Sequence, residues 1–279
     1  MSRLDRILGY KELHESGRDI WKCLLAEFVG TLFLVTVGCG SGVDWSEKSK
    51  PKEPNIVQIA LCAGIAVATL IKCICHISGG HLNPAVTCGM LVTGKFSLLK
   101  TLLYIISQVL GAIVGAGILK ALTPDDMQNN LGQTLVNPRL NPVQGFGVEF
   151  LITFVLVFTV FAVCDSNRTD LKGSAPLAIG LAVLTCHMFA LPYTGSSMNS
   201  ARSIGPAVIT GDWEHHWVYW LGPCIGGMTA GILYQSAFAA KMPDEGKDGV
   251  YFMQLKQRDG VAAEKEGATK GLMPGDTCC

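Results

Sequence analysis

The sequence predicts an all-α membrane protein, with six transmembrane helices and two shorter half-helices in inverted repeats. Three observations lead to this fold class. Only 16% of the 279 residues are charged and the mean hydropathy is +0.36, whereas a soluble domain carries roughly 25% charged residues. Six apolar stretches approach the length of about 20 residues that a helix needs to cross a bilayer. A loop motif with glycine and asparagine occurs once in each half of the chain.

The apolar stretches are expected to be six membrane spans. They cover residues 22–42, 56–76, 98–119, 146–164, 175–191 and 214–238. The second contains Lys72 close to its end, from which a long side chain can reach the membrane surface. Six spans place both termini on the same side of the membrane. The distribution of lysine and arginine weakly favours the cytoplasmic side.

The first copy of the loop motif follows the second span. Gly79 and Gly80 open an extended loop, and Asn83-Pro84 then reads as a helix start. Asparagine is a favoured N-cap, and proline is favoured at the first helical position. Because Gly89 comes soon afterwards, the helix can only be short. We therefore expect a half-helix that does not cross the membrane.

The second copy of the motif lies in the second half of the chain. Gly195 aligns with Gly79, and Asn199 aligns with Asn83, which lies 116 residues earlier. Each half contains an odd number of spans, so the second copy is inverted in the membrane. Inverted repeats place the functional site near the midplane, where the broken helices meet. Two half-helices that meet there indicate a pore.

The two motifs resemble the signature loops of aquaporins, the major intrinsic protein family. They read HISGGHLNPAVT in residues 76–87 and YTGSSMNSARS in residues 193–203, and the likeness covers about residues 20–240. The resemblance implies an aquaporin-like fold and a passive water channel of the water-selective animal type that excludes protons and ions. It also implies a homotetramer in the plasma membrane, with cytoplasmic termini and no cofactor or metal.

The two motifs suggest how such a pore would treat water and ions. Its central motifs would be Asn83, Pro84, Ala85, Asn199, Ser200 and Ala201. The asparagine amides would donate hydrogen bonds at the centre, and loop carbonyls would accept them. These carbonyls belong to Gly79, Gly80, His81, Gly195, Ser196 and Ser197. Two helix N-termini, each with roughly half a positive charge, would repel cations and protons.

The resemblance further implies a selectivity filter made of Ala63, His187, Ser196 and Arg202. An ionised residue inside a membrane is functional by default, and in the family this arginine holds water and excludes cations. The family's filter histidine fills space that a glycerol carbon would need. Ala63 departs from the pattern, because an aromatic residue is usual there. Its small side chain leaves open a second function, the passage of glycerol, urea or other small neutral solutes.

Two acids in the apolar spans occupy matching places in the two halves. Glu27 lies in Ala-Glu-Phe of the first span, and Glu149 lies in Val-Glu-Phe of the fourth. A buried acid without a partner is costly. In the family the matching acids accept hydrogen bonds from the loop backbone, so structural support is expected here rather than proton transfer.

Ser200 is a second departure from the family, which usually has proline after the second asparagine. The change removes a fixed φ and adds an N–H at the first helical position. The half-helix is still expected to form.

The chain is expected to be organised as one channel domain, residues 21–240, between two cytoplasmic segments. The domain consists of repeat one (21–120), a connecting loop (121–145) and repeat two (146–240). Residues 1–20 are polar, and the charged tail, residues 241–279, is expected to be disordered. The sequence leaves open whether Cys278 and Cys279 carry a lipid.

Other functional classes find little support in the sequence. A net charge of zero gives no reason to expect a nucleic-acid partner. The expected partners are water, small neutral solutes and the lipid bilayer. Most of the eleven cysteines lie in or beside apolar runs, where they act as small hydrophobes. No metal-ligand spacing or nucleophile–base arrangement indicates an enzyme. A coupled transporter would need an intramembrane ion site, and an adhesive protein would need an outer patch; neither is evident.

Overall fold

The computed structural model describes residues 20–46, 54–128, 130–171 and 173–241. The predicted terminal segments, 1–20 and 241–279, lie outside the described residues apart from Ile20 and Lys241. The elements in order are α3 (Ile20–Gly40), α4 (Ile56–Ser78), α5 (Pro84–Val92), α6 (Leu98–Leu122), the 3₁₀ turn η1 (Asp125–Met127), α7 (Pro142–Val163), α8 (Ala175–Thr194), α9 (Ser200–Thr210), α10 (Val218–Leu233) and the π-helical turn η2 (Tyr234–Phe238). No strand occurs in the part of the chain that the structure describes.

The all-helical fold class is confirmed, and α5 and α9 are the two expected half-helices. Among the described residues, α3, α4, α6, α7 and α8 are each long and apolar enough to cross a membrane. The sixth span begins later than expected: α10 starts at Val218 rather than at residue 214. The reason is the backbone of His215, whose φ of 49° is left-handed and stops a helix from starting earlier.

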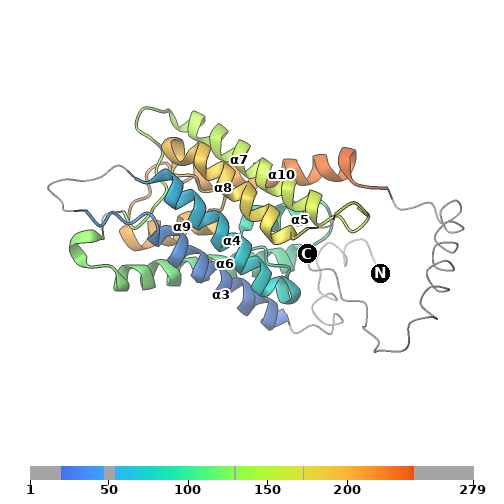
Figure 1. Cartoon of the computed structure of the whole chain (residues 1–279), viewed down its shortest axis with the longest axis horizontal. Helices are drawn as coiled ribbons and strands as arrows, with labels where there is room; N and C mark the ends of the chain where they lie inside the picture. The colour runs from blue at the N-terminus through green and yellow to red at the C-terminus, as the bar shows by residue number, and fades with distance from the viewer. Residues whose placement is uncertain (1–19, 47–53, 129, 172, 242–279) are drawn as a thin grey trace, which may run out of the picture.

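The helices pack as two interlocked halves (Figure 1). Within the halves, α3 packs on α6 and α7 packs on α10. Each half-helix crosses to the other half, so that α5 lies against α10 and α9 lies against α6. α4 and α8 pack on one another between the halves. The two halves thus make equivalent contacts, as expected of a repeated unit.

Glycines let the helix backbones come close together. A Cβ on Gly111 or Gly115 of α6 would lie only 2.3 Å from a backbone oxygen of α3. At the pseudo-symmetric centre, a Cβ on Gly64 would meet the Gly180 carbonyl at 2.6 Å, and one on Gly180 would meet the Gly64 carbonyl at 2.4 Å. The small-residue faces of α6 and α10 are therefore occupied by contacts inside the chain.

The outward faces of the long helices are apolar. Large side chains remain exposed on all six of them: Trp21 (58%), Ile65 (60%), Leu102 (49%), Leu151 (50%), Leu177 (55%) and Leu221 (50%) are examples. A continuous apolar exterior of this kind is typical of a protein that is surrounded by lipid.

Candidate functional site

The two half-helices start from asparagines with nearly the same backbone shape. Asn83 has φ −157° and ψ 121°, and Asn199 has φ −152° and ψ 109°. Oδ1 of Asn83 accepts a hydrogen bond from the N–H of Ala85 at 2.8 Å, and Oδ1 of Asn199 accepts from the N–H of Ala201 at 3.0 Å. The amide oxygens thus cap the two helices, and each NH₂ group points away from the helix that its own asparagine caps.

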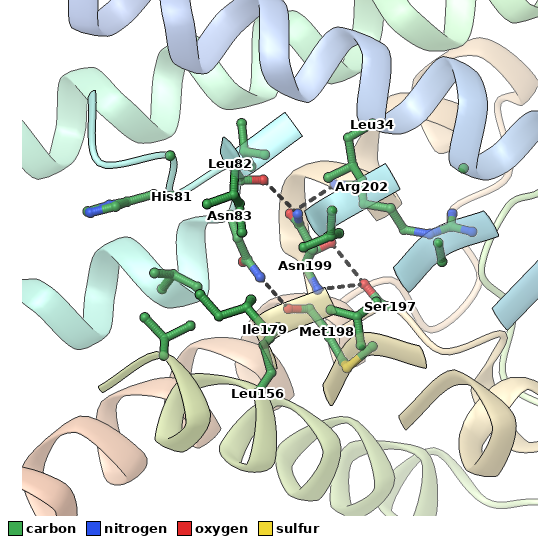
Figure 2. Close-up of a pocket in the computed structure, with 18 of the residues that line it drawn as sticks. Leu34, His81, Leu82, Asn83, Leu156, Ile179, Ser197, Met198, Asn199 and Arg202 are labelled. Atoms are coloured by element: carbon green, nitrogen blue, oxygen red, sulfur yellow. Dashed lines mark hydrogen bonds between the residues drawn. The ribbon is translucent and has the colours of Figure 1, made fainter. Parts of the chain in front are cut away.

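The asparagine NH₂ groups connect the two halves of the chain. Nδ2 of Asn83 donates to the Met198 carbonyl at 2.7 Å, and Nδ2 of Asn199 donates to the Leu82 carbonyl at 2.7 Å (Figure 2). Each group has a second hydrogen that these bonds leave unused, and both asparagines line the same cavity. The site therefore presents two donors at the point where the half-helices meet.

The loops before the half-helices contain strained backbone. Leu82, Ser196 and Met198 have left-handed φ values of 54°, 53° and 52°. Each such residue other than glycine costs on the order of 1–3 kcal/mol and persists only where its surroundings hold it. All three residues belong to the loops that precede the half-helices, and two buried acids hold these loops in place.

Glu27 of α3 holds the first loop. Its carboxylate accepts hydrogen bonds from the N–H groups of His81 (2.9 Å) and Leu82 (2.7 Å). It also accepts from the Ser78 hydroxyl at 2.7 Å and from Nε2 of Gln108 at 2.8 Å. Because every contact is a donor, this fully buried acid serves as an acceptor hub for the loop.

Glu149 of α7 holds the second loop in the same way. It accepts from the N–H groups of Ser197 and Met198, both at 2.9 Å, and from the Thr194 hydroxyl at 2.6 Å. Tyrosines complete the symmetry. The hydroxyl of Tyr104 donates to the Ser78 carbonyl and that of Tyr219 donates to the Thr194 carbonyl, both at 2.9 Å.

The cavity contains nine of the residues proposed from the sequence. They are Ala63, Gly79, Gly80, His81, Asn83, His187, Ser197, Asn199 and Arg202. The lining extends from Cys39 near the end of α3 to Val160 near the end of α7. Because the halves are inverted, these helix ends lie toward opposite faces, so the cavity follows a path across the molecule.

Six of the residues proposed for the pore and its filter do not line this cavity: Pro84, Ala85, Gly195, Ser196, Ser200 and Ala201. Ser196 is fully buried, and its hydroxyl has no hydrogen-bond partner among the described residues. Ser200 is also fully buried, at the first position of α9. The structure therefore places these side chains beside the path rather than in it.

Two polar side chains of the expected filter reach the cavity. Nδ1 of His187 lies 3.0 Å from the Val183 carbonyl, and because a carbonyl can only accept, Nδ1 carries the proton. In the neutral imidazole the other ring nitrogen is then an acceptor. Arg202 follows the Asn199 cap and extends away from the asparagine pair (Figure 2); its Nη1 is buried without a hydrogen-bond partner in the described chain.

Ala63 lines the cavity beside Ile59 and Val67 of the same helix. No phenylalanine, tyrosine or tryptophan is present among the described lining residues. The space that the usual aromatic residue would occupy is thus bordered by aliphatic side chains.

The carbonyls of Leu82 and Met198 were not identified from the sequence as part of the site. They accept the crossed asparagine bonds, and both residues line the cavity. Their signal was present, because each directly precedes an asparagine in the repeated motif. Gln108, which supports Glu27, had no comparable signal.

Comparison with known proteins identifies the family. The model of the family described as major intrinsic protein matches residues 14–234. Aquaporin-4 of Mus musculus is 52% identical over 218 residues, which cover 78% of this chain and 68% of that protein. Aquaporin-4 of Bos taurus is 51% identical over 255 residues (91% and 76%). Aquaporin FA-CHIP of Pelophylax lessonae is 42% identical over 234 residues (81% and 86%).

A solved structure has the same fold. The aquaglyceroporin from Plasmodium falciparum superposes with a TM-score of 0.70 at 24% identity and covers 78% of this chain and 97% of its own. Together with the inverted repeats and the paired asparagine loops, the sequence matches assign the chain to one protein family. This chain belongs to the major intrinsic protein family, as an aquaporin of the animal type.

Proposed function

We propose that the chain is a passive water channel and that the cavity described above is its pore. The observation that carries the proposal is the asparagine pair, Asn83 and Asn199, which lines one cavity from two opposed half-helices. Membership of a channel family agrees with the expectation that the chain is not an enzyme.

Water would pass in single file between acceptors and donors. Carbonyls of Gly79, Gly80 and Ser197 would accept hydrogen bonds, and the asparagine pair would donate to each water at the centre. Since both asparagines only donate into the pore, a central water must point its hydrogens outward, which interrupts a proton wire. The half-helix N-termini and the Arg202 charge would repel cations.

The test is stopped-flow light scattering of liposomes that contain the purified chain. An osmotic step in an impermeant solute should produce water flux well above that of protein-free liposomes, with a low activation energy. Flux that stays at the protein-free level in correctly inserted protein would contradict the proposal.

Ala63 supports a second candidate function, passage of small neutral solutes such as glycerol or urea. No aromatic side chain takes the missing space among the described lining residues. If this reading holds, labelled glycerol enters the liposomes, and Ala63→Phe abolishes that entry while water still passes. Leu61→Phe is the matched control, because Leu61 lies on the same helix with 42% of its surface exposed outward. No glycerol entry in the wild type would exclude this candidate.

We also propose how the channel is placed and assembled. It would be a multi-pass plasma-membrane protein with residues 21–240 as the channel domain, cytoplasmic termini and four copies per assembly. The apolar outer faces support membrane insertion, whereas the glycine faces are used inside the chain and do not supply the contact between copies. Native mass spectrometry would test the four-copy assembly. Protease protection of tags at both termini in intact cells would test the orientation.

A further inference from the structure

Three buried hydroxyl groups connect the segment before α7 to the second pore loop. Oγ1 of Thr134 lies 2.7 Å from Oγ of Ser203, and Oγ of Ser203 lies 2.6 Å from Oγ of Ser197. Oγ of Ser197 in turn donates to the Asn199 carbonyl at 2.9 Å. Thr134, Ser203 and Ser197 are at most 3% exposed, and of the three only Ser197 lines the cavity of the asparagine pair. These three residues form a hydroxyl chain that ends at the pore.

The number of hydrogens gives the hydroxyl chain a direction. A hydroxyl has one hydrogen and a carbonyl can only accept, so the hydrogen of Ser197 goes to the Asn199 carbonyl. Ser197 must then accept from Ser203, and Ser203 must accept from Thr134. The N–H of Asn199 also donates to Oγ of Ser197, at 3.2 Å. Thr134 is therefore the first donor of a series that ends on the residue that caps α9.

Thr134 itself lies on a segment that is anchored on both sides. Nε2 of the neighbouring Gln133 donates to the Asp212 carbonyl, just after α9, at 2.7 Å. A Cβ on Gly195, where the pore loop begins, would lie only 3.0 Å from Cα of Thr134. The Thr134 hydroxyl is thus held in place by its own backbone.

The first half of the molecule has an equivalent arrangement made of other residues. His81 and Thr87 lie 116 residues before Ser197 and Ser203. Nδ1 of His81 lies 3.0 Å from Oγ1 of Thr87, and Nε2 of Gln108 donates to the same oxygen at 3.2 Å. In both halves, a donor from outside the repeated motif reaches the pore loop through a hydroxyl of the half-helix.

The second pore loop needs such support. Ser197 lies between Ser196 and Met198, whose φ values of 53° and 52° are left-handed, and backbone of this kind persists only where its surroundings hold it. Glu149 holds the N–H groups of Ser197 and Met198. The hydroxyl chain holds the side chain of Ser197, so both the backbone and the side chain of this serine are fixed.

We propose that Thr134 is a positioning residue of the pore, whose hydroxyl acts through Ser203 to hold Ser197 and its carbonyl in place for passing water. The inference rests on the proposed channel function and adds to it a residue from outside the repeated motif. Thr134 does not line the path, so it acts on water only through the residues that it holds.

The experiment compares Thr134→Val with Thr134→Ser in liposomes that contain the purified chain. Valine keeps the shape of threonine without the hydroxyl, whereas serine keeps the hydroxyl without the methyl group. Water flux per channel should fall about threefold in Thr134→Val, because the loss of one ordinary neutral hydrogen bond changes a population by that factor. The activation energy of this flux, which does not depend on the number of folded channels, should rise. Thr134→Ser should keep the wild-type values, and a role in packing alone predicts the reverse order.

Hydrogen–deuterium exchange tests the same link without any flux. The peptide that contains Ser197 and Asn199 should exchange faster in Thr134→Val than in the wild type, and at the wild-type rate in Thr134→Ser.

Further variants separate the hydroxyl chain from a general effect of losing a threonine. Thr159→Val is the matched control, because its hydroxyl donates to the Val155 carbonyl of its own helix at 2.9 Å. It should change neither flux nor exchange. Ser203→Ala should lower the flux as Thr134→Val does, and the double variant should be no worse, because both hydroxyls act through one chain.

Two results would overturn the proposal. One is a Thr134→Val variant with wild-type flux, activation energy and exchange. The other is a Thr134→Ser variant that loses as much as Thr134→Val. Wild-type liposomes without water flux would contradict the channel function itself, whereas normal wild-type flux with an unaffected Thr134→Val variant would contradict this inference alone.

Discussion

At the scale of single residues, the pore depends on polar groups that are each matched to a partner. Glu27 and Glu149 are fully buried, and their carboxylates accept hydrogen bonds from donors in the loops and the neighbouring helices. The loops they hold contain Leu82 and Met198, whose backbones are strained. The same two carboxylates therefore stabilise the fold and fix the geometry of the pore loops.

Glu149→Gln tests this link. Ser197 and Met198 donate to different oxygens of the carboxylate. The amide keeps one oxygen and replaces the other with an NH₂ group, so one of these two N–H groups loses its acceptor. We expect a loss of about 2–4 kcal/mol of stability, measured as a lower midpoint of thermal unfolding, together with reduced water flux. Glu214→Gln is the control, since its side chain is 74% exposed and a surface charge contributes little. Equal midpoints for both variants would show that the loop does not need the buried acid.

Arg202→Val tests the proposed filter. The change removes the fixed positive charge whose Nη1 is buried in the cavity wall without a hydrogen-bond partner among the described residues. Cation leak, measured as dissipation of a potassium gradient across liposomes, should rise while water still passes. Selectivity identical to the wild type in folded protein would remove Arg202 from the filter.

At the scale of elements, the half-helices are stable because their starts are built alike. The two asparagine caps differ little in φ and ψ, although proline follows one and serine follows the other. The helix start is thus set by the asparagine and the buried acid behind it, and proline is not required.

Ser200→Pro follows from that geometry. Asn199 already has the extended backbone that precedes proline, and the first helical N–H needs no partner within the helix. We expect the fold and water flux to persist, with a gain of roughly 0.4–1 kcal/mol from a less flexible unfolded chain. Denaturation in detergent would measure this gain. A clear destabilisation would mean that the contact of the Ser200 hydroxyl with the Cys224 sulfur, 3.8 Å away, matters more than the backbone.

Replacing glycine with alanine should change the stability in opposite directions at two positions, one packed between α4 and α8 and one on the open face of α7. Gly64→Ala places a methyl group 2.6 Å from the Gly180 carbonyl, and such overpacking should cost about 1–3 kcal/mol. Gly147→Ala on α7 meets nothing within 4 Å, so it should stabilise its helix by roughly 0.5–1 kcal/mol. Thermal unfolding of both variants checks this, and a neutral Gly64→Ala would show that the two helices can separate at little cost.

At the scale of the whole molecule, hydropathy and the repeated motif were enough to predict the spans, the half-helices and the inverted halves. They could not predict the start of α10, which depends on the backbone of His215. Nor could they predict the crossed bonds from Asn83 to Met198 and from Asn199 to Leu82, because these depend on loops 116 residues apart meeting in space. Patterns within the chain reveal elements, whereas contacts between halves appear only in the folded structure.

The central claim is that two opposed half-helices enclose a path that admits water and rejects ions. The most direct measurement records osmotic water flux and potassium leak together, on the same liposomes with the purified chain. The account predicts water flux far above the protein-free level and potassium leak at that level. Water flux at the protein-free level, or water and potassium passing together, would contradict it.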